Sequence, residues 1–129
     1  TRDWWPDMLK NYEPVVSPVV IEEISDGDPI AVEERLEAIQ NFRVLENDPA
    51  IKTVADKYFY SLKIPERARN DTFHLAFAAY YRIDYLVTWN CKHIANAQLL
   101  KIIQEINIDQ RYKTPVICTP LELQAGIEE

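Results

Sequence analysis

Residues 71–90, DTFHLAFAAYYRIDYLVTWN, decide the fold class of this 129-residue chain. The segment from Asp71 to about Arg82 has helical spacing and is apolar on nearly every side, which predicts a helix buried at the centre of the protein. The continuous apolar run from Tyr85 to Thr88 predicts an interior strand of a parallel sheet, covered on both faces. A buried helix that leads directly into a buried strand indicates an α/β fold.

The rest of the chain repeats this alternation of strands and helices. We expect strands at 15–17, 42–45 and 116–118, with helices between them and a short helix after the last strand. Asp28-Pro29 and Asp48-Pro49 each combine an N-cap residue with a proline at the first helical position. The sequence therefore predicts one domain, residues 1–129, with four strands in a mostly parallel sheet and helices on both faces.

Composition restricts the classes of function. Hydrophobic residues make up 47% of the chain and charged residues 27%, as in ordinary soluble proteins, and no stretch approaches the ~20 apolar residues of a membrane span. The two cysteines, Cys91 and Cys118, have no CxxC spacing, which predicts reduced, buried thiols in a cytoplasmic protein. The net charge of −7 argues against a broad nucleic-acid-binding surface, but metal ions could supply positive charge to a small site.

Oxygen-bearing side chains follow the predicted strands, at the edge where open α/β sheets place their active sites. Glu22 and Glu23 come after the first strand, and Thr88 and Asn90 come at the end of the most buried one. Asp71 stands in the first turn of the buried helix, where the helix dipole favours a negative charge. Carboxylate, amide and hydroxyl oxygens are the ligands that Mg²⁺ and Mn²⁺ prefer, so we expect a divalent-metal site here.

The order of these motifs resembles that of PIN domains, which include the toxin nucleases of VapC type. Residues 71–79 and 84–90 resemble the part of the family in which an acidic residue opens a buried helix and a strand then ends in Thr-x-Asp or Thr-x-Asn. Residues 17–24 resemble the family's Ser-x5-Glu-aliphatic segment, which singles out Glu23. A bacterial subgroup with a Trp-Asn-x-x-His-Ile motif is similar to the stretch from Trp89 to Ile94, and 115–123 match the usual ending.

The resemblance spans residues 17–123 and implies a three-layer α/β/α sandwich with metal-dependent endoribonuclease activity. The implied cofactor is Mg²⁺ or Mn²⁺ and the substrate is RNA, with an antitoxin protein as a candidate partner and a homodimer as the expected assembly. Glu23, Asp71 and Asn90 would hold the metal and take part in catalysis. The surrounding residues implied are Thr88 and His74 beside these ligands, and Lys92, Arg67 and Arg69 as contacts to phosphates.

Two departures from the family pattern define a second hypothesis. PIN domains begin with a central strand that ends in an acidic residue, and residues 1–12 are too polar and too rich in Trp to be that strand. We therefore expect the chain to be truncated at its N-terminus relative to the family, and Tyr85–Thr88 not to pair directly with Val15–Ser17. Asn90 stands where many members have Asp. The alternative is a catalytically inactive PIN-fold module that binds RNA or protein.

Each candidate residue also has a structural interpretation. Asp71 could help to start its helix with Asn70 as the N-cap, and Glu23 could be a solvated acid beside Glu22. Asn90 could be a turn residue, and His74 could be hydrogen-bonded in the core. Aromatic residues at helical spacing indicate core or a dimer interface more often than a platform for bases; they are Tyr58, Phe59, Tyr60, Tyr80 and Tyr81.

Overall fold

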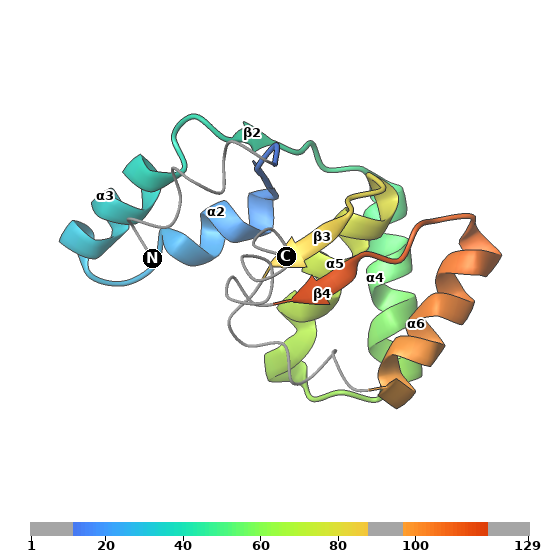
Figure 1. Ribbon diagram of the computed structural model, residues 1–129. Helices are drawn as coiled ribbons and strands as arrows, with labels where there is room; N and C mark the ends of the chain where they lie inside the picture. The colour runs from blue at the N-terminus through green and yellow to red at the C-terminus, as the bar shows by residue number, and fades with distance from the viewer. Residues whose placement is uncertain (1–11, 88–96, 119–129) are drawn as a thin grey trace. The chain divides into compact units, whose positions relative to one another are not determined.

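The computed structural model describes residues 12–87 and 97–118 of a mixed α/β chain that forms two compact units. Unit 1 lies within residues 1–47 and unit 2 within residues 48–129. Unit 1 contains β1 (Val15–Val16), α2 (Pro18–Ile24), α3 (Pro29–Ala38) and β2 (Arg43–Val44). Unit 2 contains α4 (Pro49–Leu62), the 3-10 turn η1 (Glu66–Ala68), α5 (Arg69–Tyr80), β3 (Tyr85–Val87), α6 (Ala97–Gln110) and β4 (Val116–Cys118) (Figure 1).

Local capping signals determine where the helices of unit 1 begin. Ser17 ends β1 and caps α2, because its hydroxyl accepts a hydrogen bond from the Val20 N–H at 3.3 Å. Asp28 caps α3 in the predicted way, since its carboxylate accepts from the Ala31 N–H at 3.1 Å and a proline follows it. β1 and β2 run parallel. Of the residues that the structure describes in unit 1, only Ser17 and Leu45 are buried.

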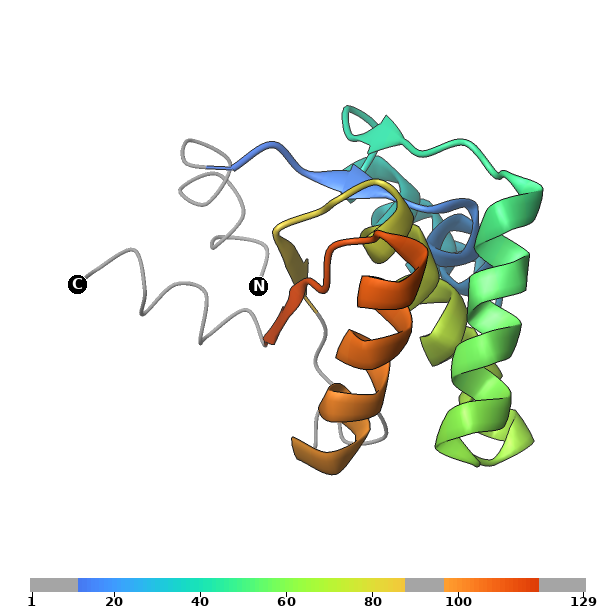
Figure 2. The ribbon, with the colours of Figure 1, turned by 90° about the vertical axis from the view of Figure 1, so that its right-hand side faces the viewer.

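The core of unit 2 forms around α4. Asp48 caps this helix by accepting from the Ala50 N–H at 2.9 Å, and Lys63 ends it in a left-handed conformation with φ of 54°. The apolar stripe of α4 is buried at Ile51, Val54, Ala55, Tyr58 and Leu62. It packs against α5 and α6. Figure 2 shows α4 and α6 side by side, with β3 and β4 next to them.

The predicted central helix is confirmed, but its start was placed too late. α5 begins at Arg69, directly after η1 and two residues before the predicted start at Asp71. Ala68 occupies the N-cap position and supplies no side-chain hydrogen bond, so the interpretation of Asn70 as the cap is wrong. The helix is buried over half its length, at Thr72 and at Leu75, Ala76, Phe77, Ala78 and Ala79.

The strands are parallel as predicted, but β3 is less covered than its apolar sequence suggested. β3 pairs with β4 in the register Tyr85 to Val116, Leu86 to Ile117 and Val87 to Cys118. Tyr85 is 41% exposed, and Leu86 and Val87 are half-buried, so the prediction of a strand covered on both faces is wrong for these three residues. Thr88 lies outside the described residues. Cys118 is buried, and Cys91 is outside the described part.

The four described strands form two two-stranded sheets, β1 with β2 and β3 with β4. Val15–Val16 pairs with Arg43–Val44 within unit 1, and Tyr85–Val87 pairs with Val116–Cys118 within unit 2. The expectation that Tyr85–Thr88 does not pair directly with Val15–Ser17 stays a prediction. The N-terminal truncation relative to the PIN family stays a prediction. No helix within these ranges combines the length and the apolar character that crossing a membrane requires.

Candidate functional site

Asp71 lies in the first turn of α5 and is half-buried. Because α5 begins at Arg69, Asp71 is the third residue of the helix and not its first. Ala68 contributes no capping side chain, so the positive end of the helix is not offset by a polar group at the N-cap. A carboxylate in the first turn is favoured at such an end. Six of the twelve residues of α5 are buried, among them Thr72, which directly follows Asp71.

His74 follows Asp71 by one turn of α5, which places the two residues on the same side of the helix. It is half-buried, as is Asp71. The spacing predicted from the sequence is therefore present in the structure.

Glu23 lies in the last turn of α2 in unit 1, and Glu22 is beside it. Both side chains are exposed, so burial does not distinguish one from the other. Glu23 and Asp71 belong to different units. Their convergence on one metal ion stays a prediction, and so does the participation of Asn90, Thr88 and Lys92, which lie outside the described residues.

Arg69 interacts with three other side chains of unit 2. Its guanidinium donates two hydrogen bonds to the Glu66 carboxylate, at 2.8 and 3.1 Å, and lies 3.6 Å from the Asp56 carboxylate. Its Cζ stands 3.9 Å from the centre of the Phe59 ring, within the range of a cation–π contact. The hydrogen bond from Arg69 lowers the pKa of Glu66. A phosphate at Arg69 would have to compete with Glu66, which leaves the exposed Arg67 as the more accessible of these two predicted phosphate contacts.

A buried polar network between α4 and α6 was missed by sequence reasoning. The Tyr58 hydroxyl donates to the Asn107 side-chain oxygen, and the Asn107 amide donates to the Thr114 hydroxyl at 2.8 Å. The Asn107 carbonyl also accepts from the Tyr112 N–H at 2.7 Å. Tyr58 and Asn107 are both fully buried, and burial raises the pKa of the Tyr58 phenol. The signal available in the sequence was the place of Asn107 one turn after Ile103, on the apolar stripe of α6.

The chemistry of the described residues includes no assembled metal centre. Among residues 12–87 and 97–118, no group of three or more His, Cys, Asp or Glu side chains is placed to hold an ion. Comparison of the chain with protein-family models, curated proteins and solved structures found no match.

Proposed function

We propose that this chain has a PIN-type fold and that the full-length protein is a divalent-metal-dependent endoribonuclease. The observation that supports the proposal best is the place of Asp71. It stands in the first turn of a helix buried over half its length, and the chain passes from this helix through a short turn into the parallel strand β3. A carboxylate in the first turn of a partly buried helix is the arrangement that the motif order implied.

The proposed ligands fit a hard cation. Asp71 and Glu23 offer carboxylate oxygens and Asn90 an amide oxygen, with no sulfur donor in the set. Glu23 is exposed and Asp71 half-buried, so both can reach an ion. When bound, Mg²⁺ or Mn²⁺ would supply Lewis-acid chemistry toward water and a phosphodiester. The chain's own part would be to fix the ligands on α2, on α5 and after β3, and to bind flanking phosphates through Arg67 and Lys92.

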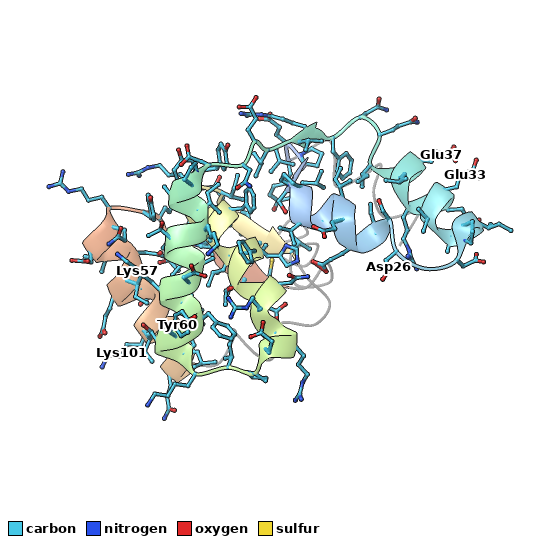
Figure 3. The ribbon with its side chains drawn as sticks, turned by 180° about the vertical axis from the view of Figure 1, so that it is seen from behind. Asp26, Glu33, Glu37, Lys57, Tyr60 and Lys101 are labelled. Atoms are coloured by element: carbon cyan, nitrogen blue, oxygen red, sulfur yellow. The ribbon has the colours of Figure 1, made fainter. Side chains whose placement is uncertain are left out.

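An RNA substrate would approach unit 2 more readily than unit 1. Residues 48–129 contain ten acidic and ten basic side chains, whereas residues 1–47 contain eleven acidic and four basic ones. Tyr60 is 69% exposed on α4, one turn after Lys57. Lys101 is on α6, which packs against α4, and Figure 3 shows all three on the side of unit 2 that these helices form. An exposed aromatic ring with flanking cations suits contact with single-stranded RNA.

A second candidate function is an inactive module of the same fold that binds RNA or protein. Asn90 in place of an acidic residue favours it, because an amide lacks the negative charge that would hold a second ion. The strongly acidic unit 1 also favours recognition of a protein.

The deciding experiment is the substitution Asp71→Asn in the full-length protein, compared with Asp109→Asn on the exposed side of α6. Both changes remove one carboxylate with little change in shape. We expect Asp71→Asn to abolish Mn²⁺-dependent cleavage of single-stranded RNA while Asp109→Asn cleaves like the parent. Thermal unfolding without metal should show a loss of at most about 1 kcal/mol for Asp71→Asn, the usual size of a helix-dipole interaction.

The possible results separate the hypotheses. Cleavage retained by Asp71→Asn would place the active site elsewhere. A parent protein that binds RNA but does not cleave it with Mg²⁺ or Mn²⁺ would favour the inactive module. A large fall in the melting temperature of Asp71→Asn alone would show that Asp71 serves the helix and not a metal.

A further inference from the structure

Arg69 is the first residue of α5, and a cation at this place runs against the local preference of a helix. The N-terminus of a helix carries partial positive charge, so a positively charged side chain in the first turn is unfavourable. Ala68 at the N-cap supplies no side-chain hydrogen bond that would offset this charge. A residue that conflicts with its local context indicates an interaction made elsewhere in the structure.

The Arg69 side chain is held by groups on two elements, and only 31% of it is exposed. Its guanidinium donates to both oxygens of the Glu66 carboxylate, at 2.8 and 3.1 Å, which is the paired geometry of a strong arginine–carboxylate contact. On α4, the Asp56 carboxylate lies 3.6 Å from the guanidinium, and the centre of the Phe59 ring lies 3.9 Å from Cζ. We call Arg69, Glu66, Asp56 and Phe59 the Arg69 clasp.

The main chain of Arg69 belongs to the same junction. Its N–H donates to the Glu66 carbonyl, and its carbonyl accepts from the hydroxyl of the buried Thr72 at 2.6 Å. The helices α4 and α5 pack against each other, and Figure 3 shows them side by side. A restraint on the Arg69 side chain is therefore also a restraint on the backbone from 69 to 72, which includes Asp71.

Arg69 can act on Asp71 through this backbone. Residues two positions apart lie about 200° apart around a helix, so the two side chains do not face each other. The ion pairs of Arg69 go instead to Glu66 and Asp56. Removal of a group that orients a metal ligand typically weakens metal binding by about 10–100-fold, although that group does not touch the metal.

We propose that Arg69 is a positioning residue for the metal site. The Arg69 clasp fixes the first turn of α5 against α4, and the Asp71 carboxylate is thereby held in place for a divalent cation. This inference rests on the proposed function. It gives Arg69 an internal role, whereas the exposed Arg67 remains the candidate contact to a phosphate.

The first test needs no metal. NMR relaxation of the metal-free, full-length protein gives order parameters for the backbone amides of residues 70–72. We expect values of about 0.85 in the parent and below about 0.6 in Arg69→Gln. Phe59→Leu removes the ring beside the guanidinium without changing any charge, and it should lower the order parameters by a smaller amount. The matched control is Arg67→Gln, which removes the same charge from an exposed side chain and should leave them unchanged.

The second test measures the affinity for Mn²⁺, with free Mn²⁺ detected by electron paramagnetic resonance at a temperature at which every variant is folded. Loss of a nearby cation would, through charge alone, strengthen Mn²⁺ binding. Loss of a positioning contact weakens it, so the two explanations differ in sign. We expect Arg69→Gln to bind Mn²⁺ about tenfold more weakly than the parent, with a smaller loss in Phe59→Leu.

Two further variants complete the Mn²⁺ series. Arg67→Gln should bind Mn²⁺ as tightly as the parent or slightly more tightly, because it changes only the charge. Arg69→Lys keeps the charge but not the paired hydrogen bonds, so its affinity should lie between those of Arg69→Gln and the parent.

The outcomes separate this inference from the proposed function. Unchanged order parameters in Arg69→Gln would overturn the clasp independently of any metal. If Asp71→Asn weakens Mn²⁺ binding but Arg69→Gln leaves it unchanged or strengthens it, Arg69 does not position the site. Equal Mn²⁺ affinity of the parent and Asp71→Asn would instead refute the metal site of the proposed function, and with it any role of Arg69 there.

Discussion

Replacing Tyr58 with Phe tests whether the buried network between α4 and α6 holds unit 2 together. The hydroxyl lies on a fully buried ring and donates to the side-chain oxygen of Asn107, which is also fully buried. Its removal leaves that oxygen without its partner and out of reach of water. The aromatic ring stays, so no cavity term is added, and the expected cost is the about 1–3 kcal/mol of an unsatisfied buried acceptor.

A loss of about 2 kcal/mol corresponds to a fall in melting temperature of roughly 6–10 °C for a chain of this size. Urea unfolding followed by circular dichroism measures it directly. Tyr60→Phe is the matched control, because the same hydroxyl is removed from a ring that is 69% exposed, and it should change stability by less than about 0.5 kcal/mol. Equal effects of the two substitutions would refute the argument.

A double-mutant cycle strengthens this test. Asn107→Leu alone strands the Tyr58 hydroxyl, whereas Tyr58→Phe/Asn107→Leu removes both partners. The double variant should be less destabilised than the sum of the single variants by about 1 kcal/mol. Because burial raises the folded-state pKa of Tyr58, its contribution is present in full below the unfolded value of about 10 and is lost as the pH rises towards the folded pKa. Tyr58→Phe should therefore lose less stability in alkali than the parent.

Two smaller effects follow from local geometry. Lys63 adopts a left-handed conformation with φ of 54°, so Lys63→Gly should raise the free energy of unfolding by about 0.5–1 kcal/mol. Lys63→Ala is the control and should leave the free energy of unfolding unchanged. A loss of stability in Lys63→Gly would show that the Lys63 side chain makes stabilising contacts. The pKa of Glu66 is lowered by the hydrogen bond from Arg69, so the stabilisation is present above the unfolded pKa of about 4.3 and declines as the pH falls through the folded value. Glu66→Gln should flatten that acid decline in pH-dependent unfolding curves, and an unchanged curve would refute the role of the pair.

The helix starts that the sequence predicted correctly are those set by neighbours in the chain. Asp28 and Asp48 each cap a helix through their own side chains, and the signal is complete within four residues. The start of α5 was missed because no capping side chain at its N-terminus marks it in the sequence. Ala68 is a poor cap by composition, and the turn at 66–69 is held by Arg69, which bonds Glu66 and stacks on Phe59 from another helix.

The period of the sequence agrees with the burial seen in α4 and α5, but the predicted burial of β3 was wrong. The apolar stripe of α4 needs only the period of the helix, which the sequence contains. The coverage of Tyr85–Val87 depends on which elements lie against the strand, and an apolar run cannot specify its neighbours. The burial of Asn107 could not be predicted for the same reason. It depends on hydrogen bonds to Tyr58 and Thr114, which lie outside α6, and a pattern within α6 does not specify their positions.

The candidate metal ligands also divide into those placed by local pattern and those whose position depends on the arrangement of the strands. The place of Asp71 on a buried helix follows from local pattern, and the structure agrees with it. The proposed approach of Glu23 and Asn90 to Asp71 depends on the order of the strands in the sheet. Short motifs show the order of the strands along the chain, but they do not specify which strands are neighbours in space. That part of the proposal rests on the PIN resemblance, and the Asp71→Asn experiment tests its central member.

The two units differ in what their residues contribute. Among the described residues, every buried hydrophobic side chain except Leu45 belongs to unit 2, while residues 1–47 account for the whole net charge. Substitutions at the buried positions of unit 2 should therefore act mainly on stability. Substitutions of exposed residues of α3 such as Glu33 and Glu37 remove neither a packed side chain nor a described ion pair, so they should change the free energy of unfolding by less than about 0.5 kcal/mol, which urea unfolding can measure.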